Sequence, residues 1–156
     1  MNGGQVDASI IDSKQRLRIW LRLLKLSRSI ESEIRERLRV EFGTTLPRFD
    51  VLAALYRSPD GLKMTELSQA LMVSNGNVTG IVERLVQDGL VRRLPVEGDR
   101  RAMVVRLTEK GRENFASMAE VHERWIGSLI GSIDNNDAGR LHDLLGKVTV
   151  DKRDLA

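Results

Sequence analysis

The chain has 156 residues, of which 41% are hydrophobic and 30% charged, a balance typical of one globular domain with its own core. The formal net charge is +3, and the lack of cysteine excludes disulfides, cysteine-rich zinc sites and thiol-based redox sensing. No apolar run approaches the ~20 residues of a membrane helix, and the N-terminus lacks the pattern of a signal peptide. We therefore expect a cytoplasmic protein with no membrane partner.

A loose tail and a long helix are predicted at the start of the chain. Residues 1–12 are small and polar, whereas apolar residues from Ser13 to about Val40 recur at spacings of three and four along two stripes. Two apolar stripes indicate more than one buried face, which often means a second subunit. Gly43 ends this helix, and the next is predicted from Leu46 to Arg57. Its inward residues are expected to be Phe49, Leu52, Ala53 and Tyr56.

Short elements follow in the middle of the chain. Thr65 is predicted to cap a short helix, and Ser74 to cap the next one, which runs from Asn75 to about Gln87. Glycine and proline then mark the turns of a hairpin. The predicted strands are 62–64, 90–94 and 102–107, with a hairpin loop over 95–100.

The C-terminal part is predicted to be helical again. Thr108 is a candidate cap for a helix with apolar residues at helical spacing from Phe115 to Ile133, and a last helix follows the polar stretch 134–137. The predicted organisation is therefore a tail over 1–12, helical regions over 13–45 and 112–150, a region of short helices and strands over 46–111, and a tail over 151–156.

The order of the middle elements predicts a winged helix-turn-helix, in a mainly α fold whose small β-hairpin forms the wing. A helix fits the major groove of DNA, and the preceding helix braces it across the backbone. Short polar residues at the start of the second helix suit base edges and phosphates: Ser74, Asn75, Gly76, Asn77 and Thr79. Gly76 and Gly80 each weaken the helix by about 1 kcal/mol relative to alanine, which suggests close approach to DNA or to the bracing helix.

The wing carries the sequence Asp99-Arg100-Arg101. In an extended loop, residues 99 and 101 project the same way, so Asp99 is expected to hold and aim the Arg101 guanidinium. A narrow, A·T-rich minor groove attracts such an arginine through its negative potential. Arg100 would point elsewhere, toward a phosphate.

These residues resemble the MarR (multiple antibiotic resistance regulator) family of bacterial transcription regulators. The resemblance is carried by MTELSQALMVSNGNVTGIVERLVQDGLVRR followed by PVEGDRRAMVVRLTEKG, and it extends over about residues 15–150. It implies an obligate homodimer with a helical dimerisation region over 13–45 and 112–150 and a winged helix-turn-helix DNA-binding region over 46–111. Such a dimer would bind a pseudo-palindromic double-stranded DNA operator as a repressor and would be released by a small effector such as an aromatic acid or its coenzyme A thioester. Arg84 would also face the DNA. Members that sense oxidants use cysteine, which this chain lacks.

Other interpretations of single residues remain open. Arg84 could pair with Asp88 at i,i+4, and Arg92 and Arg93 suit the strand surface or phosphates better than bases. Trp20 and Trp125 are core residues or line an effector pocket. Arg22 belongs to a solvated face of the first helix or meets an anionic ligand there.

Two rival functions remain alternatives to DNA binding. A winged-helix protein-interaction module would need apolar anchors in place of the polar face over 74–79. An enzyme would need His122 or His142 in a catalytic or metal-ligand arrangement, for which no motif exists. We therefore predict no enzyme activity, no cofactor and no metal.

Overall fold

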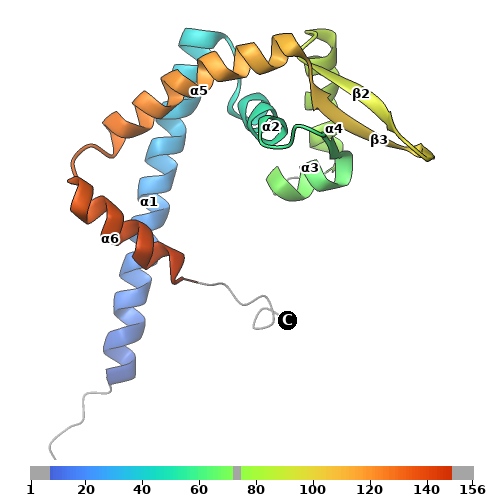
Figure 1. Cartoon of the computed structure of the whole chain (residues 1–156). Coiled ribbons are helices and arrows are strands. Elements are labelled where there is room, and N and C mark those ends of the chain that lie inside the picture. The colour runs from blue at the N-terminus through green and yellow to red at the C-terminus, as the bar shows by residue number, and fades with distance from the viewer. Residues whose placement is uncertain (1–7, 72–74, 149–156) are drawn as a thin grey trace, which may run out of the picture. The chain divides into compact units, whose positions relative to one another are not determined.

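The computed structural model describes residues 8–71 and 75–148, and within them the chain forms six helices and three strands. The chain is divided into two compact units, Met1–His122 and Glu123–Ala156. The first unit holds the predicted helix-turn-helix and its wing, so a mainly helical fold with a small β-hairpin is confirmed (Figure 1).

Helix α1 (Ala8–Phe42) begins before the predicted start at Ser13. No glycine or proline lies within it, so nothing in its local sequence interrupts the helix. Gly43 ends it with a φ of 60°, and the Thr44 N–H donates to the Leu38 carbonyl at 3.2 Å, which closes the last turn.

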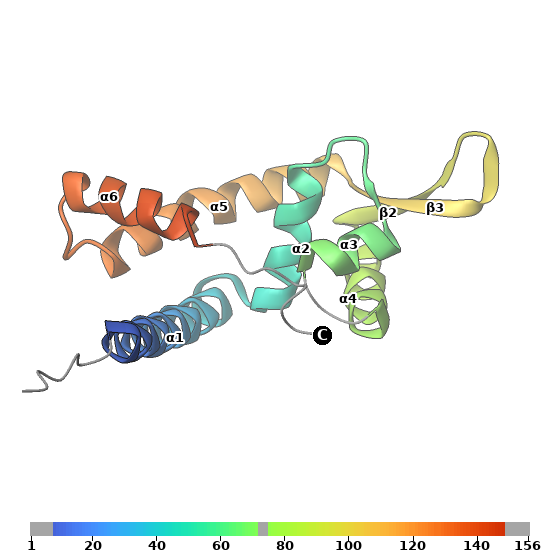
Figure 2. The same ribbon diagram turned by 90° about the horizontal axis from the view of Figure 1, so that it is seen from below.

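Residues 46–107 fold as the predicted winged helix. Three helices, α2 (Leu46–Tyr56), α3 (Met64–Leu71) and α4 (Asn75–Gln87), gather beside the strands β1 (Leu62–Lys63), β2 (Val91–Val96) and β3 (Asp99–Leu107) (Figure 2). The antiparallel sheet has the order β1-β3-β2, with Leu62 opposite Val105 and Val91 opposite Leu107. The hairpin of β2 and β3 extends beyond the helices, which places the wing at the free end of the sheet.

Leucine and valine side chains form the core between the helices and one face of the sheet. The most deeply buried ones are Val51, Leu52, Leu55, Leu67, Val78, Val82, Leu85, Val91 and Val105. Burying each stabilises the fold by about 1.5–3 kcal/mol. Phe49 and Leu52 point inward as predicted, but Tyr56 is exposed and Ala53 only half-buried. Val51 and Leu55 are buried instead, because α2 packs against α3, α4 and β3 and so buries more than one face.

Two boundaries predicted within the winged helix were also wrong. Helix α3 begins at Met64, so Thr65 lies inside the helix; the Glu66 carboxylate accepts the Lys63 N–H at 2.7 Å and thereby completes the first turn. The predicted hairpin loop over 95–100 is also too long, because Val96 still pairs with Asp99. Gly98, with a φ of 81°, permits the tight turn between them.

Helix α5 (Glu109–Leu129) starts in the first unit and continues into the second, where α6 (Asn135–Gly146) follows. The α5 helix ends before the predicted Ile133. Asp134 caps α6 by accepting the Asp137 N–H at 2.8 Å. None of the α6 residues is buried, and its large apolar residues Leu141, Leu144 and Leu145 are exposed.

Candidate nucleic-acid interface

Helix α4 is held by its apolar face and presents a polar one. Val78, Val82 and Leu85 are completely buried, at spacings of four and three. Gly76, Asn77 and Arg84 are exposed, and Thr79 is half-buried. Ser74 lies outside the described residues, and of Asn75 the structure describes only the backbone at the start of α4.

A groove runs along the polar face of α4. Its volume is about 320 Å³, and it is lined by Thr45, Arg48, Gly76, Asn77, Gly80, Ile81 and Arg84. The structure therefore brings the predicted residues Gly76, Asn77 and Arg84 together. Among the described residues, a Cβ at Gly76 or Gly80 would meet nothing within 4 Å. Contact with the described part of the bracing helix therefore does not explain these glycines.

Arg48 in α2 is a cation of this groove that sequence reasoning missed. It forms an ion pair with Asp88 at the end of α4, forty residues along the chain, and its hydrogen bond holds the pKa of that carboxyl below its usual value. The Arg48 Nε is buried without a partner among the described residues. Because Asp88 pairs with Arg48, the structure does not show the alternative pairing of Asp88 with Arg84.

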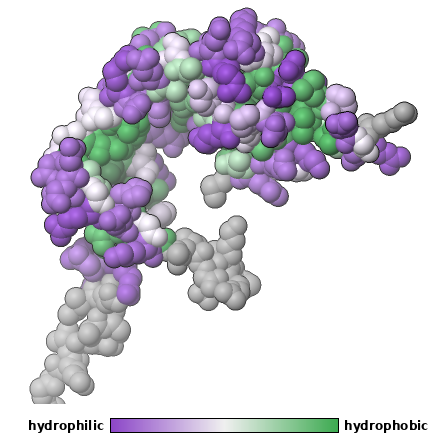
Figure 3. Space-filling view, in the orientation of Figure 1, coloured by the Kyte–Doolittle hydropathy of each residue, from purple (hydrophilic) through white to green (hydrophobic). Residues whose placement is uncertain are grey.

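The wing differs in detail from the prediction. Asp99 Oδ1 accepts the backbone N–H of Arg101 at 3.1 Å, so the observed contact fixes the backbone of the hairpin end rather than the guanidinium. The Arg101 side chain is exposed, and of Arg100 the structure describes only the backbone within β3. Hydrophilic residues gather at this end of the hairpin (Figure 3).

A hydrogen-bonded junction ties the end of α4 to the start of α5. The Thr108 hydroxyl accepts the Gly111 N–H at 3.0 Å, which confirms Thr108 as a cap, and it donates to the Gly89 carbonyl at 2.7 Å. Lys110 Nζ donates to the Asp88 carbonyl at 2.9 Å. These bonds fix the direction in which the chain leaves α4.

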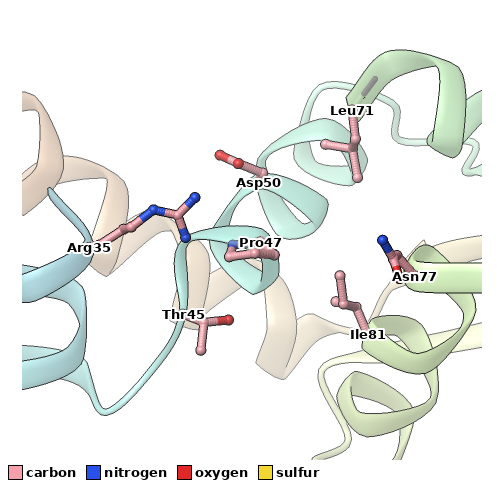
Figure 4. Close-up of a pocket in the computed structure, with 7 residues that line it drawn as sticks. All are labelled: Arg35, Thr45, Pro47, Asp50, Leu71, Asn77 and Ile81. Carbon is pink, nitrogen blue, oxygen red and sulfur yellow. The ribbon is translucent and has the colours of Figure 1, made fainter. Parts of the chain in front are cut away.

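A second cavity lies between α1, α2, α3 and α4. Its volume is about 530 Å³, and its lining residues are Arg35, Thr45, Pro47, Asp50, Leu71, Asn77 and Ile81. Figure 4 shows Arg35 and Asp50 on one side, across from Asn77 and Ile81 of α4. The cavity thus offers a cation, a carboxylate and an apolar wall to a small molecule.

Burial shifts the pKa values of two ionisable groups in opposite directions: Asp50, which lines this cavity, and His122. Burial raises the pKa of Asp50, against the effect of the nearby Arg35 and His122 charges. Burial also lowers the pKa of His122, and Asp50 partly offsets that shift. The His122 ring packs against Phe49 with centroids 4.7 Å apart, which supports a structural role for this histidine.

The three residues predicted for an effector pocket do not line this cavity. Trp20 and Arg22 lie on the exposed part of α1, and Trp125, in the second unit, is buried. Sequence reasoning missed Arg35 and Asp50 because no local motif joins residues on α1 and α2.

Residues 8–71 and 75–148 contain no group of three or more histidine, aspartate or glutamate side chains placed to hold a metal ion. Over the same ranges, no helix is both long enough and apolar enough to cross a membrane.

Comparisons with known proteins agree with this geometry. A sequence model described as the MarR family matches residues 42–102. The transcriptional activatory protein BadR of Rhodopseudomonas palustris is 33% identical over 140 residues, which is 86% of this chain and 79% of BadR. This chain belongs to the MarR family. The crystal structure of a MarR family transcriptional regulator from Silicibacter pomeroyi is 34% identical, with a TM-score of 0.71 over 86% of this chain and 92% of that one.

Membership in the MarR family makes the chain a transcriptional regulator rather than an enzyme. The regulator PecS of Dickeya dadantii is also similar, at 33% identity over 102 residues; the match spans 64% of this chain and 61% of PecS. The family match contains α2, α3, α4 and most of the hairpin, and therefore both the α4 groove and Arg101.

Proposed function

We propose that this MarR-family regulator binds a pseudo-palindromic DNA operator as a homodimer, with α4 in the major groove and Arg101 in the minor groove. The observation that carries the proposal is the groove on the polar face of α4, which two glycines and an asparagine line together with Arg48 and Arg84. Glycines allow close approach, the amide of Asn77 can bond to a base edge, and the two guanidinium groups can hold phosphates. The polar face also argues against a protein-interaction module, which would need apolar anchors there.

Exposed apolar residues at both ends of the chain support the homodimer. On α1, Leu17, Ile19, Trp20 and Leu21 are each more than half exposed, and on α6 Leu144 is 58% exposed. Leaving so many large apolar side chains in water is unfavourable, and a second copy would cover them. We expect half-sites about one helical turn, ~34 Å, apart, and sedimentation at micromolar concentration should show a dimer.

The DNA-binding proposal is tested by fluorescence anisotropy over a salt series, with DNA from upstream of the protein's own gene. Phosphate contacts predict that log K falls steeply against log salt. Arg101→Ala should weaken specific binding by about 1–3 kcal/mol, mainly at A·T-rich flanks. Arg57→Ala removes the same charge at the end of α2 and should change affinity little. Equal effects of the two substitutions would remove the wing from the DNA interface.

We also propose that the regulator is a repressor released by a small effector that occupies the cavity beside Arg35 and Asp50. Its volume of about 530 Å³ suits a small aromatic acid, whose carboxylate could pair with Arg35 and whose ring could lie on Pro47 and Ile81. In a screen of aromatic acids and their coenzyme A thioesters, a compound that lowers DNA affinity in the wild type should have little effect on Arg35→Gln. Absence of any active compound would favour constitutive regulation.

A further inference from the structure

The free edge of the sheet borders a groove that the proposed function does not use. In the described part of the chain, β3 lies between β1 and β2, so one edge of β2 has no neighbouring strand. The last turns of α4 lie beside this strand. Between them is a groove of about 500 Å³, lined by Glu83, Val86, Gln87, Arg92 and Arg93.

The positive charge of this groove is not neutralised by ion pairs among the described residues. Arg92 lies directly opposite Arg106 in the pairing of β2 with β3, and like charges in that arrangement destabilise a sheet. Neither arginine, nor Arg93, forms an ion pair within the described residues, and Glu83 is the one carboxylate that lines the groove. Two arginines in the groove at the edge strand, with a third opposite Arg92 on the central strand, indicate an anionic partner.

An apolar side chain distinguishes this groove from a phosphate site. Val86 is 39% exposed, whereas Val78 and Val82 of the same helix are completely buried. A DNA backbone rewards positive charge but has no apolar side chain to cover a valine. Val86 also lies about 13.5 Å along the helix axis from Asn77, since each residue of a helix rises 1.5 Å. The groove therefore lies beside the last turns of α4, next to Arg84, and away from the N-terminal end that is proposed to read bases.

We propose that the groove between α4 and β2 binds an extended acidic segment of a protein partner. Carboxylates of the segment pair with Arg92 and Arg93, an apolar side chain covers Val86, and the backbone can hydrogen-bond to the free edge of β2. Because the groove is separate from the first turns of α4, we expect the base-reading end of the helix to stay free when this partner is bound.

The test uses the full-length protein and a fluorescein-labelled peptide of six residues, the length of β2, rich in aspartate and glutamate with a central leucine. Its anisotropy should rise on titration, and a matched peptide with asparagine and glutamine should bind weakly. The double substitution R92Q/R93Q should lower the affinity for the acidic peptide by about fivefold, the effect expected from the loss of two exposed ion pairs. Glu83→Gln removes the repulsive carboxylate and should tighten binding. Equal binding of both peptides, or no gain with Glu83→Gln, would overturn the proposal.

DNA is the competing occupant, and the same variants identify it. If the groove binds the acidic peptide, DNA should not displace the peptide, and R92Q/R93Q should leave the salt dependence of DNA binding unchanged. If instead the double variant lowers the slope of log K against log salt by about two and DNA displaces the peptide, the groove is a phosphate site and the proposal fails. The peptide titration needs no DNA, so its result does not depend on the proposed operator binding.

Discussion

Replacing Gly80 with alanine separates two properties that this position affects, the stability of α4 and its access to DNA. Gly80 lies inside the helix, and an added Cβ would meet no described atom within 4 Å. Alanine should therefore fit without strain and raise the free energy of unfolding by about 0.8–1 kcal/mol, the difference in helix propensity. For a chain of this size, we expect Tm to rise by about 2–4 °C.

DNA affinity should move in the opposite direction. Gly80 lies in the groove between Arg48 and Arg84, so the added methyl group would hold DNA away from the helix surface. The expected loss is about 1–3 kcal/mol, comparable to that of a mismatched base pair, and anisotropy titration would measure it on the sample used for thermal denaturation.

A matched glycine provides the control. A Cβ at Gly139, inside α6, would also meet nothing described within 4 Å. Gly139→Ala should therefore raise Tm without weakening DNA binding, and sedimentation would check the dimer. If Gly80→Ala raised Tm and bound DNA like the wild type, the close-approach argument would be refuted.

Three further predictions concern the supports of the site. Thr108→Val removes both the cap of α5 and the bond to Gly89, and should lower the free energy of unfolding by about 1–3 kcal/mol in denaturant titration; no change would mean that the junction contributes nothing to stability. Gly111→Ala would place a Cβ onto the Leu90 carbonyl, so we expect a loss of about 3 kcal/mol or more, and a variant as stable as the wild type would contradict that packing. Burial lowers the pKa of His122, so below about pH 6.5 the unfolded chain binds more protons than the folded one, and the free energy of unfolding should fall as the pH drops. In His122→Phe, the denaturation midpoint should depend less on pH between about pH 7.5 and 5. An unchanged pH dependence would assign the effect to another group.

The winged helix could be predicted because its signals are local. Gly43 and Gly89 both have positive φ where the sequence predicts helix ends, and the apolar spacing of α4 gives the face that is buried. The cap at Thr108 follows from the same local chemistry. At Thr65 the predicted cap was wrong by two residues. Helix α3 begins at Met64, and the Glu66 carboxylate accepts the Lys63 N–H and so completes the first turn.

The charged contacts between elements could not be predicted in this way. Asp88 has Arg84 at helical spacing, yet it pairs with Arg48, which folding brings close from another helix. The cavity proposed for the effector could not be predicted for the same reason, because folding brings Arg35 and Asp50 together from different helices. Sequence spacing within one helix says nothing about such pairs.

The shared residues of the two cavities suggest how an effector could act on DNA binding. Asn77 and Ile81 line both the α4 groove and the cavity beside Arg35, so a ligand in the cavity would touch the helix proposed to read DNA. Contact alone shifts no equilibrium; a tenfold loss of DNA affinity requires the ligand to bind the DNA-free form about 1.4 kcal/mol more tightly. If the side-chain amide of Asn77 can hydrogen-bond either to the ligand or to a base but not to both, the ligand binds the DNA-free form more tightly for that reason. By reciprocity, saturating DNA should then lower the affinity for the ligand tenfold in the wild type. Asn77→Ala should reduce both the effect of the ligand on DNA affinity and the effect of DNA on ligand affinity.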